Sequence, residues 1–379
     1  MYDVQPAEEP DWTSPPFAAE IQDLPGVGPA VVARGSANSK GTLAGLFVAV
    51  EILGELDLMP VTIALFIEGE EELGSPHLAE TIEKHRDDLA GDAAFDMDLT
   101  AGLDGRPELV TGCKGLLSLE LSARGGEWGG PEIPLHSSEQ AWIASPAWAL
   151  VHALATLTDP DEGIVVAGLA EGAEPPAEED LLAIKRLAQT FDPEAHLKGA
   201  HARHFRLKGS TEALLKALMF EPTLNIDGLE AGYVGPGGKT IIPAEARAVL
   251  DVRLVPDMDA DRTTAAVRRH LDDHGFAHVE MTQLEHYPWA KAPADNAVAR
   301  ALQASYDDLG LSFLPYPLAP WCAPYFVLDR ILGLPWACGG AGHAAGAHGP
   351  DEYASVEGLR QHIEGVAAFL LAYAREAAA

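Results

Sequence analysis

Residues 60–78 read PVTIALFIEGEEELGSPHL, and the remaining sequence can be arranged around them. Nearly every position of 61–67 is apolar and several side chains are β-branched, which predicts a buried inner strand of a parallel sheet. Ser-Pro at 75–76 suits the start of a helix. The glutamates of 68–72 therefore crowd the carboxyl end of a strand, where ligands bind in open α/β sheets. Their mutual repulsion must be offset by a cation, a proton or open water, so a ligand site and a solvated acidic loop both fit.

Composition limits the class of partner. The chain has 379 residues, long enough for two domains, and its 58 Asp and Glu against 25 Lys and Arg give a net charge of −33. A nucleic-acid partner needs a basic surface and is not expected. The acidity fits either a salty cytoplasm or a solubility requirement. We expect a cytoplasmic protein without membrane contact, because no apolar run is long enough to span a bilayer and the first residues lack a signal-peptide pattern.

The order of predicted elements indicates an α/β domain interrupted by a second domain. Residues 1–33 look irregular, and 41–114 alternate helix and strand as in a mostly parallel sheet. Residues 115–287 instead contain strands with one polar face, interspersed with helices, which predicts an inserted α+β domain. Residues 288–379 return to the first domain. The helix expected over 41–56 carries an apolar stripe of Leu43, Leu46, Phe47, Val50 and Leu53.

Polar side chains gather at predicted strand ends and glycine-rich turns. They are Asp3, Asn38, the acidic run 70–72 together with Asp98, and His348. Oxygen ligands with an imidazole suit zinc or a similar divalent ion, and a carboxylate left free nearby can serve as a general base. The cysteines Cys113, Cys322 and Cys338 match no zinc or redox spacing, so we expect them to be reduced and structural.

The ordered motifs resemble one family. They are DVQP at 3–6, RGSANSKG at 34–41, EGEEELGS at 68–75 and AHGPDEY at 347–353, joined in the inserted domain by LHS at 135–137, GKTIIP at 238–243 and RLVP at 253–256. The chain resembles the dinuclear-zinc family of aminoacylase, glutamate carboxypeptidase, succinyl-diaminopimelate desuccinylase and carnosine dipeptidase, and is most similar to its dipeptidase branch. The resemblance implies a metallohydrolase that cleaves an amide bond in dipeptides or N-acyl amino acids. It also implies that 115–287 form a lid and dimerisation domain.

The resemblance assigns metal ligands. Glu72 and His348 would hold one zinc ion, and Asp98 would hold the other. Asn38 stands where the family has a carboxylate that bridges both ions. Because an amide is neutral, it compensates two dications less well than a carboxylate, so the chain is expected to bind one or two ions.

The resemblance also assigns catalytic and substrate-binding residues. Glu71 would be the general base that takes a proton from the activated water, and Asp3 would orient a ligand imidazole. His136 would reach the site of a homodimer partner and stabilise the oxyanion, or else be a surface loop residue. Arg253 would bind a substrate carboxylate, or else simply pair with Asp251. Asn225 and Thr240 complete the substrate-binding set.

Met1 departs from the family, which has a metal-binding His at that place and a helix and strand upstream. We expect the natural protein to begin some tens of residues earlier, or His343 to supply the missing ligand. A non-catalytic dimeric binding protein of the same fold is the competing interpretation.

Overall fold

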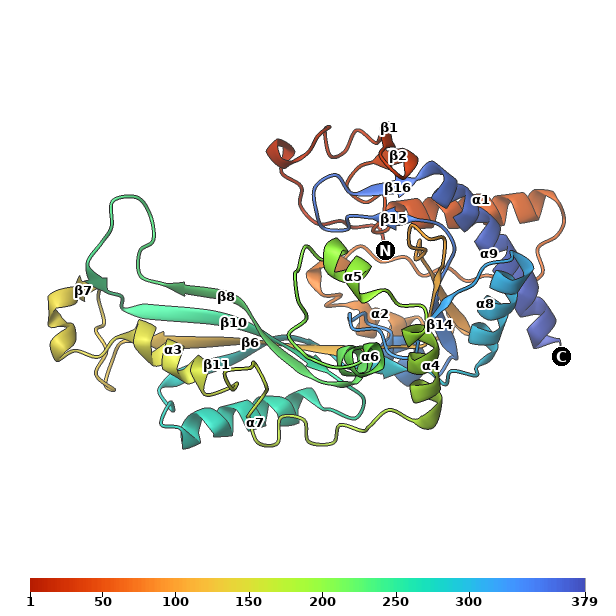
Figure 1. The fold of residues 1–379 in the computed structure, drawn as a ribbon. Coiled ribbons are helices and arrows are strands. Elements are labelled where there is room, and N and C mark those ends of the chain that lie inside the picture. Colours follow the sequence, from red (N-terminus) through yellow and green to blue (C-terminus); the bar gives the residue numbers. More distant parts are fainter. Residues whose placement is uncertain (379) are drawn as a thin grey trace.

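The computed structural model describes residues 1–378, which form two groups of sheets and helices (Figure 1). The first sheet has the order β13 (Leu314–Tyr316), β4 (Glu108–Val110), β14 (Trp336–Gly339) and β3 (Ala94–Met97). Strand β13 runs parallel to β4 and β14 runs parallel to β3, while β14 and β4 are antiparallel. The prediction of a mostly parallel sheet in the first domain is therefore confirmed.

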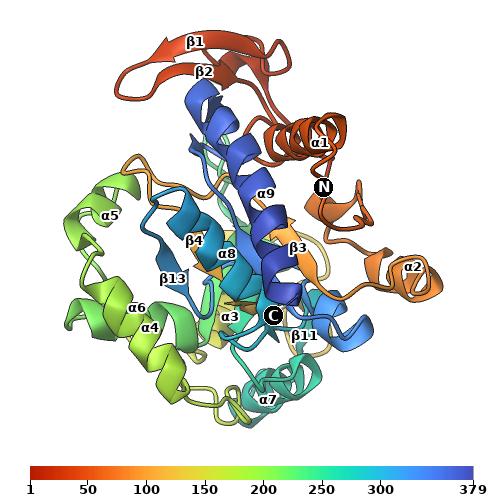
Figure 2. The same cartoon turned by 90° about the vertical axis from the view of Figure 1, so that its right-hand side faces the viewer.

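Three long helices pack with this sheet: α1 (Lys40–Glu55), α8 (Ala297–Asp308) and α9 (Val356–Ala377). Helix α9 lies beside α8 and α1, and the three share one apolar core with β4 and β14 (Figure 2). A second, antiparallel sheet has the order β1 (Glu20–Leu24), β2 (Gly28–Val32), β16 (Tyr353–Ser355) and β15 (Ala344–Ala345). This sheet joins residues 20–32 to the segment that carries His348.

The inserted part forms an antiparallel sheet with the order β11 (Val279–Tyr287), β6 (Gly115–Arg124), β10 (Glu245–Leu254) and β8 (Thr223–Ala231). Alternate side chains of β6 and β10 are fully buried under α3 (Pro146–Ala155) and α7 (Ala260–Asp273). The opposite face carries the polar residues of both strands. An inserted α+β part with one polar sheet face is what the alternation of Leu and polar residues in β6 predicted.

Three further helices connect α3 to β8: α4 (Glu178–Ala188), α5 (Pro193–Gly199) and α6 (Thr211–Phe220). Helices α4 and α6 share an apolar cluster with Leu318, and α4 contacts β13. They therefore lie against the first sheet. The remaining elements are short: η1 (Glu9–Asp11), η2 (Glu71–Leu73), α2 (Leu78–Lys84), β5 (Gly112–Cys113), β7 (Leu135–His136), η3 (Ser137–Ala141), β9 (Ile241–Ile242), β12 (Ala290–Lys291) and η4 (Val327–Ile331).

The strand predicted over 61–67 is wrong. The segment has no regular secondary structure and pairs with no strand among the described residues, so β3 is the edge of its sheet. Val61 and Ile63 pack on the helical core, whereas Leu65, Phe66 and Ile67 are 46%, 39% and 38% exposed. Apolar residues predict burial but do not supply the backbone hydrogen bonds that make a strand.

Two other expectations differ from the structure. Residues 20–32 form the β1–β2 hairpin rather than irregular structure. Helix α1 buries Thr42, Gly45, Ala49 and Leu53, so its small residues rather than most of the predicted stripe face α9. A Cβ at Gly45 would collide with the ring of His362, which explains why the close contact requires glycine.

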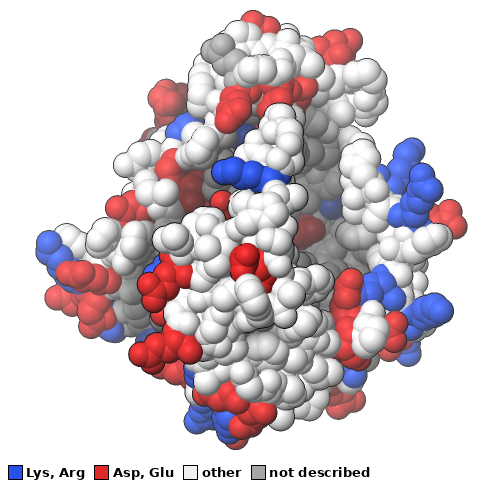
Figure 3. Space-filling view, turned by 90° about the vertical axis from the view of Figure 1, so that its left-hand side faces the viewer, with Lys and Arg blue, Asp and Glu red and all other residues white. Residues whose placement is uncertain are grey.

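The surface is acidic, as the composition requires. On the face drawn in Figure 3, Asp and Glu side chains are scattered among uncharged ones, and the Lys and Arg side chains form no continuous patch. Among the described residues, no helix combines the length and apolar content that a membrane crossing requires.

Candidate metal and catalytic site

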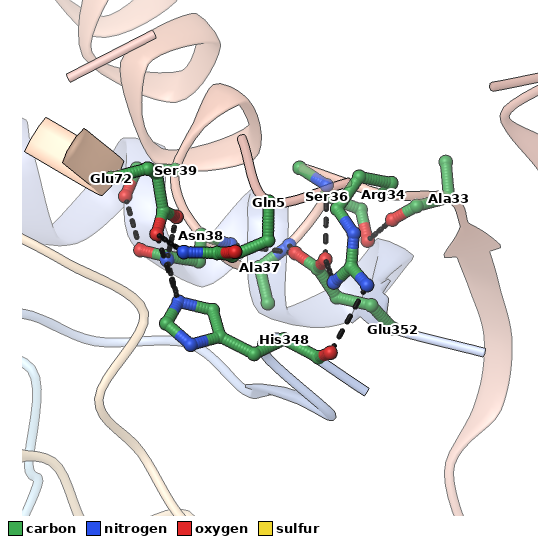
Figure 4. A network of polar contacts seen from close by, with 11 residues as sticks. Gln5, Ala33, Arg34, Ser36, Ala37, Asn38, Ser39, Glu72, His348 and Glu352 are labelled. Carbon is green, nitrogen blue, oxygen red and sulfur yellow. Dashed lines mark hydrogen bonds and ion pairs between the residues drawn. The ribbon is translucent and has the colours of Figure 1, made fainter. Parts of the chain in front are cut away.

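The loop that carries Asn38 is fixed by one buried carboxylate. Glu352, whose side chain is 0% exposed, accepts hydrogen bonds on Oε1 from the backbone N–H groups of Ala37 and Asn38, at 2.9 and 2.8 Å. Its Oε2 accepts from the Gly35 N–H at 3.0 Å and from Arg34 Nη1 at 2.8 Å. Arg34 also donates to the His348 carbonyl oxygen at 3.1 Å. Glu352 and Arg34 therefore connect the backbones of two predicted ligands (Figure 4).

Asn38, Glu72 and His348 converge in this structure (Figure 4). Asn38 Nδ2 lies 2.9 Å from Glu72 Oε1 and 3.1 Å from His348 Nε2. Gln5 Nε2 donates to Glu72 Oε2 at 2.7 Å, and Asp3 Oδ2 accepts from the Glu72 backbone N–H at 2.8 Å. Asp3 therefore positions the residue that carries a predicted ligand, although no contact joins it to an imidazole among the described residues.

Glu72 and His348 have the separation of two ligands on one metal ion. Glu72 Oε2 and His348 Nε2 are 3.3 Å apart. Ligands that share a tetrahedral zinc ion at bond lengths of about 2.0–2.2 Å lie about 3.3–3.6 Å apart. Rotation of the Asn38 amide would present Oδ1 to the same point. Residues 1–378 contain no cluster of three or more His, Cys, Asp or Glu side chains suited to a metal, and Asn38 is the third polar side chain beside Glu72 and His348.

Asp98 makes no hydrogen bond or ion pair with that group among the described residues. It follows β3, and its Oδ1 accepts a hydrogen bond from the Leu99 N–H at 2.8 Å. Burial and the neighbouring charge of Asp96 raise the pKa of Asp98 to about 7, and burial and Asp98 likewise raise the pKa of Glu108 to about 7. No hydrogen bond or ion pair of the described residues joins Asp98 to Asn38, Glu72 or His348. The structure therefore brings three of the four predicted ligands together.

Glu71 begins η2, directly before Glu72. Burial raises its pKa to about 7, and the charges of Glu72, Glu68 and Asp3 act in the same direction. A carboxylate with a pKa near neutrality can accept and return a proton at neutral pH. Burial raises the pKa of Tyr287, on β11, and of Cys322, and the charge of Glu71 acts in the same direction on both.

Arg253 lies on the polar face of the inserted sheet. Its Nε donates to Asp251 Oδ1 at 3.1 Å, so the pairing considered from the sequence is present. Its Nη1 contacts Cys322 Sγ at 3.1 Å. Asn225, which is opposite Asp251 in the β8–β10 register, donates to Asp227 Oδ1 at 2.8 Å. Arg253 is thus oriented by one carboxylate and one thiol.

His136 and Thr240 are at the far tip of the inserted part, on and beside the short pair β7 and β9 (Figure 1). His136 Nε2 is 3.3 Å from Thr240 Oγ1, and His136 Nδ1 is 2.9 Å from Ser138 Oγ. Neither residue contacts Glu72 within this chain. His343 is also separate, because its ring nitrogens bind the Ala101 carbonyl at 2.8 Å and the Tyr353 hydroxyl at 3.0 Å.

Three residues at these sites were not predicted from the sequence. Glu352 lies inside the quoted motif AHGPDEY and Arg34 inside RGSANSKG. Gln5 lies in DVQP beside Asp3. No pattern identified them, because a buried ion pair joins residues 318 positions apart.

Comparison with known proteins gives a consistent result. The profile described as peptidase family M20/M25/M40 matches residues 2–372. The human Beta-Ala-His dipeptidase is 30% identical over 279 residues, covering 72% of this chain and 52% of that protein. The Cys-Gly metallodipeptidase DUG1 of Saccharomyces cerevisiae is 29% identical over 276 residues, covering 72% of this chain and 55% of that protein. The chain thus spans about half the length of the curated relatives it matches.

Solved structures show the same fold. The M20 family metallo-carboxypeptidase Sso-CP2 of Sulfolobus solfataricus superposes with a TM-score of 0.87 at 29% identity, over 99% of this chain and 84% of that one. The dipeptidase Dug1p of Saccharomyces cerevisiae superposes with a TM-score of 0.83 at 24% identity, over 99% of this chain and 78% of that one, which supports the fold alone. With the profile match over nearly the whole sequence, these results show that the chain belongs to peptidase family M20/M25/M40.

Proposed function

We propose that this chain hydrolyses the amide bond of dipeptides or N-acyl amino acids that carry a free carboxylate. The observation that carries the proposal is the pairing of Glu72 with His348 at 3.3 Å, directly beside Glu71. Membership of a peptidase family and the names of the two curated relatives, both dipeptidases, support the substrate class.

We further propose that Glu72, His348 and Asn38 hold one divalent ion, with zinc as the expected metal. A bound dication would supply Lewis acidity, which makes a water molecule more acidic and polarises the scissile carbonyl. Asp98 is the ligand that a second ion would need. Asn38 supplies no bridging charge, so this chain binds the second ion poorly.

Glu71 is the proposed general base, and it accepts the proton of the attacking water. Its half-buried position beside other carboxylates keeps its proton affinity close to that required at neutral pH. Asp3 holds the Glu72 backbone and so keeps the Glu71–Glu72 turn in place. The proposed base, Glu71, and the proposed metal ligand, Glu72, are thus adjacent residues.

Arg253 is proposed to bind the substrate carboxylate, with Asn225 and Thr240 as further substrate-binding residues. We place the domain limits at 1–114 with 288–379 for the catalytic domain and 115–287 for the lid and dimerisation domain. Because His136 lies at the tip of the inserted part, it would reach the site of a second copy in a cytoplasmic homodimer and stabilise the oxyanion there (Figure 1).

The test compares Glu71→Gln with Glu70→Gln on a panel of dipeptides and N-acetyl amino acids. Glu70 is a matched control, because its carboxylate is 43% exposed and binds only His77, at 2.8 Å, among the described side chains. We expect Glu71→Gln to lower turnover by about 10²–10⁴ while zinc content and fold persist. Glu70→Gln should retain turnover. Activity of Glu71→Gln within a factor of about two of the parent would remove the role of Glu71, and inactivity of the parent on every substrate would favour the non-catalytic alternative.

A further inference from the structure

Lys114 is a buried cation that the proposed mechanism does not use. It directly precedes β6 and is 1% exposed. Its Nζ donates to the Glu221 carbonyl oxygen at 2.6 Å, and within residues 1–378 it forms no ion pair with a carboxylate. Burying an ammonium group without a counter-ion costs free energy, so the burial of Lys114 requires a structural or functional reason.

Lys114 and Arg253 lie on one face of the inserted sheet. The β10–β6 register places Arg253 opposite Leu116 and Leu254 opposite Gly115. Side chains two positions apart on a strand point to the same side, so Lys114 projects on the same face as Leu116 and Arg253. Burial, followed by the charge of Arg253, lowers the pKa of Lys114 to about 8. Electrostatic repulsion between the two cations therefore contributes to the lowered pKa of Lys114.

Few anions offset these two charges. Arg253 pairs with Asp251, but burial and a hydrogen bond with Asp251 raise the pKa of Asp227. A carboxyl group with a raised pKa gives up its proton less readily, so burial weakens Asp227 as a counter-ion for Arg253. Glu221 is the other acidic residue that acts on Lys114, and the Cys322 thiol, which burial keeps protonated, faces Arg253. Among the described residues, Asp251 is therefore the one carboxylate that forms an ion pair with either cation.

The backbone of Lys114 also holds the segments around Arg253. Its N–H donates to the carbonyl oxygens of Ala319 and Trp321, at 3.1 and 3.2 Å, and so fixes the chain just before Cys322. Its ammonium group holds Glu221, two residues before Thr223, which is opposite Arg253 in the β8–β10 register. Lys114 thus connects the start of β6 to two segments that border the guanidinium group.

We propose that Lys114 and Arg253 form one cationic subsite for a carboxylate, in which Arg253 touches the ligand and Lys114 is a positioning residue. Lys114 keeps the subsite electropositive and holds the segments that orient Arg253. The inference rests on the proposed function, in which Arg253 binds the substrate carboxylate. It adds Lys114, which supports that binding without touching the ligand. A carboxylate that enters the subsite supplies the counter-ion that Lys114 lacks and a second carboxylate partner for Arg253.

The test measures equilibrium binding rather than turnover. N-acetylleucine and N-acetylleucine amide are titrated by NMR into Glu71→Gln chains, which cannot hydrolyse them under the proposed mechanism and whose zinc content is checked. These probes have no amino group that titrates near neutrality. Lys114→Met removes the charge at similar volume, Lys114→Arg keeps it, and Cys322→Ser tests the thiol.

We expect Lys114→Met to weaken binding of N-acetylleucine by about tenfold, the change that corresponds to one pKa unit of coupling between ligand and ammonium group. Binding of the amide should change little, and Lys114→Arg should restore the preference for the carboxylate. In the Lys114 parent, the affinity for N-acetylleucine should fall as the pH rises through about 8, and Lys114→Arg should abolish that fall.

Equal losses for both probes in Lys114→Met would show a merely structural role and overturn the inference. So would a parent without preference for the carboxylate, or a flat pH profile in the parent, which needs no variant to fold. If no substrate is hydrolysed but the carboxylate preference depends on Lys114, the subsite stands and only the proposed function fails.

Discussion

Replacing Glu352 by Gln tests the buried carboxylate that fixes the loop carrying the proposed metal ligand Asn38. The carboxylate pairs with Arg34 at 2.8 Å, and the two side chains are 0% and 4% exposed. Removing one partner of a buried ion pair leaves an uncompensated charge and costs about 3–5 kcal/mol. The amide also keeps only one of the two oxygens that accept four hydrogen bonds, so an NH₂ group must face N–H donors.

The consequence extends to the metal because Glu352 and Arg34 hold the backbones of Asn38 and His348. We expect Glu352→Gln to lower the free energy of unfolding by about 3–5 kcal/mol in urea titrations and to weaken zinc binding by about 10–100-fold. The control is Glu357→Gln on α9, where the carboxylate pairs with Arg360 in solvent and little change is expected. A loss of stability below about 1 kcal/mol, or unchanged zinc affinity, would refute the reasoning.

Three further predictions concern pH, assembly and salt. The pKa of the Lys114 ammonium group is about 8 in the folded chain, against an ordinary value of 10.5. Between these two pH values the unfolded state binds more protons than the folded state, so the free energy of unfolding rises with pH. We therefore expect the parent to gain up to about 3 kcal/mol of stability relative to Lys114→Met as the pH rises from about 8 to 10.5. Urea titrations of both proteins across that range check the sign, since a falling difference would contradict it. Mixing Glu71→Gln with His136→Ala chains should restore part of the activity in hybrid dimers, whereas a fully active monomer would contradict the exchange of His136 between subunits. Because the chain has a net charge of −33, its melting temperature should rise with KCl concentration as repulsion among acidic side chains is screened (Figure 3). A melting temperature that does not respond to KCl would contradict the interpretation that the acidity fits a salty cytoplasm.

The inserted sheet was predictable because its pattern is local. Leu117, Leu119 and Leu121 alternate with Ser118 and Glu120, and the three leucines are fully buried. The alternation of apolar and polar residues within one strand is enough to decide which face of the sheet is covered, whatever the partner strands are. The same reasoning failed at 61–67, where apolar character is high but no neighbouring strand completes the ladder.

Helix packing was predicted less well because contact faces depend on the partner. The bulky stripe of α1 looked like its buried face, but α9 approaches through Gly45 and Ala49, where small side chains permit close contact. Phe47 is left 45% exposed. Periodicity gives the existence of the helix and not which side a partner selects.

Some residues of the candidate site were likewise predicted from the sequence, and others were not. The motifs named Asn38, Glu72 and His348 by residue type, and the structure places the three together. Glu352 and Lys114 were missed because their importance comes from burial, which no single-sequence pattern records. A lysine at the start of a strand resembles any solvated surface residue until its surroundings are known.

The most direct test of the proposed one-ion site is the zinc content of three proteins: the parent, His348→Ala and Asp98→Asn. Each is equilibrated with excess zinc, dialysed and measured by mass spectrometry for bound ions per chain. Because Glu72, His348 and Asn38 contact one another while Asp98 contacts none of them, we predict about one ion in the parent and in Asp98→Asn, and its loss in His348→Ala. Retention of zinc in His348→Ala, or its loss on replacement of Asp98 alone, would contradict the site.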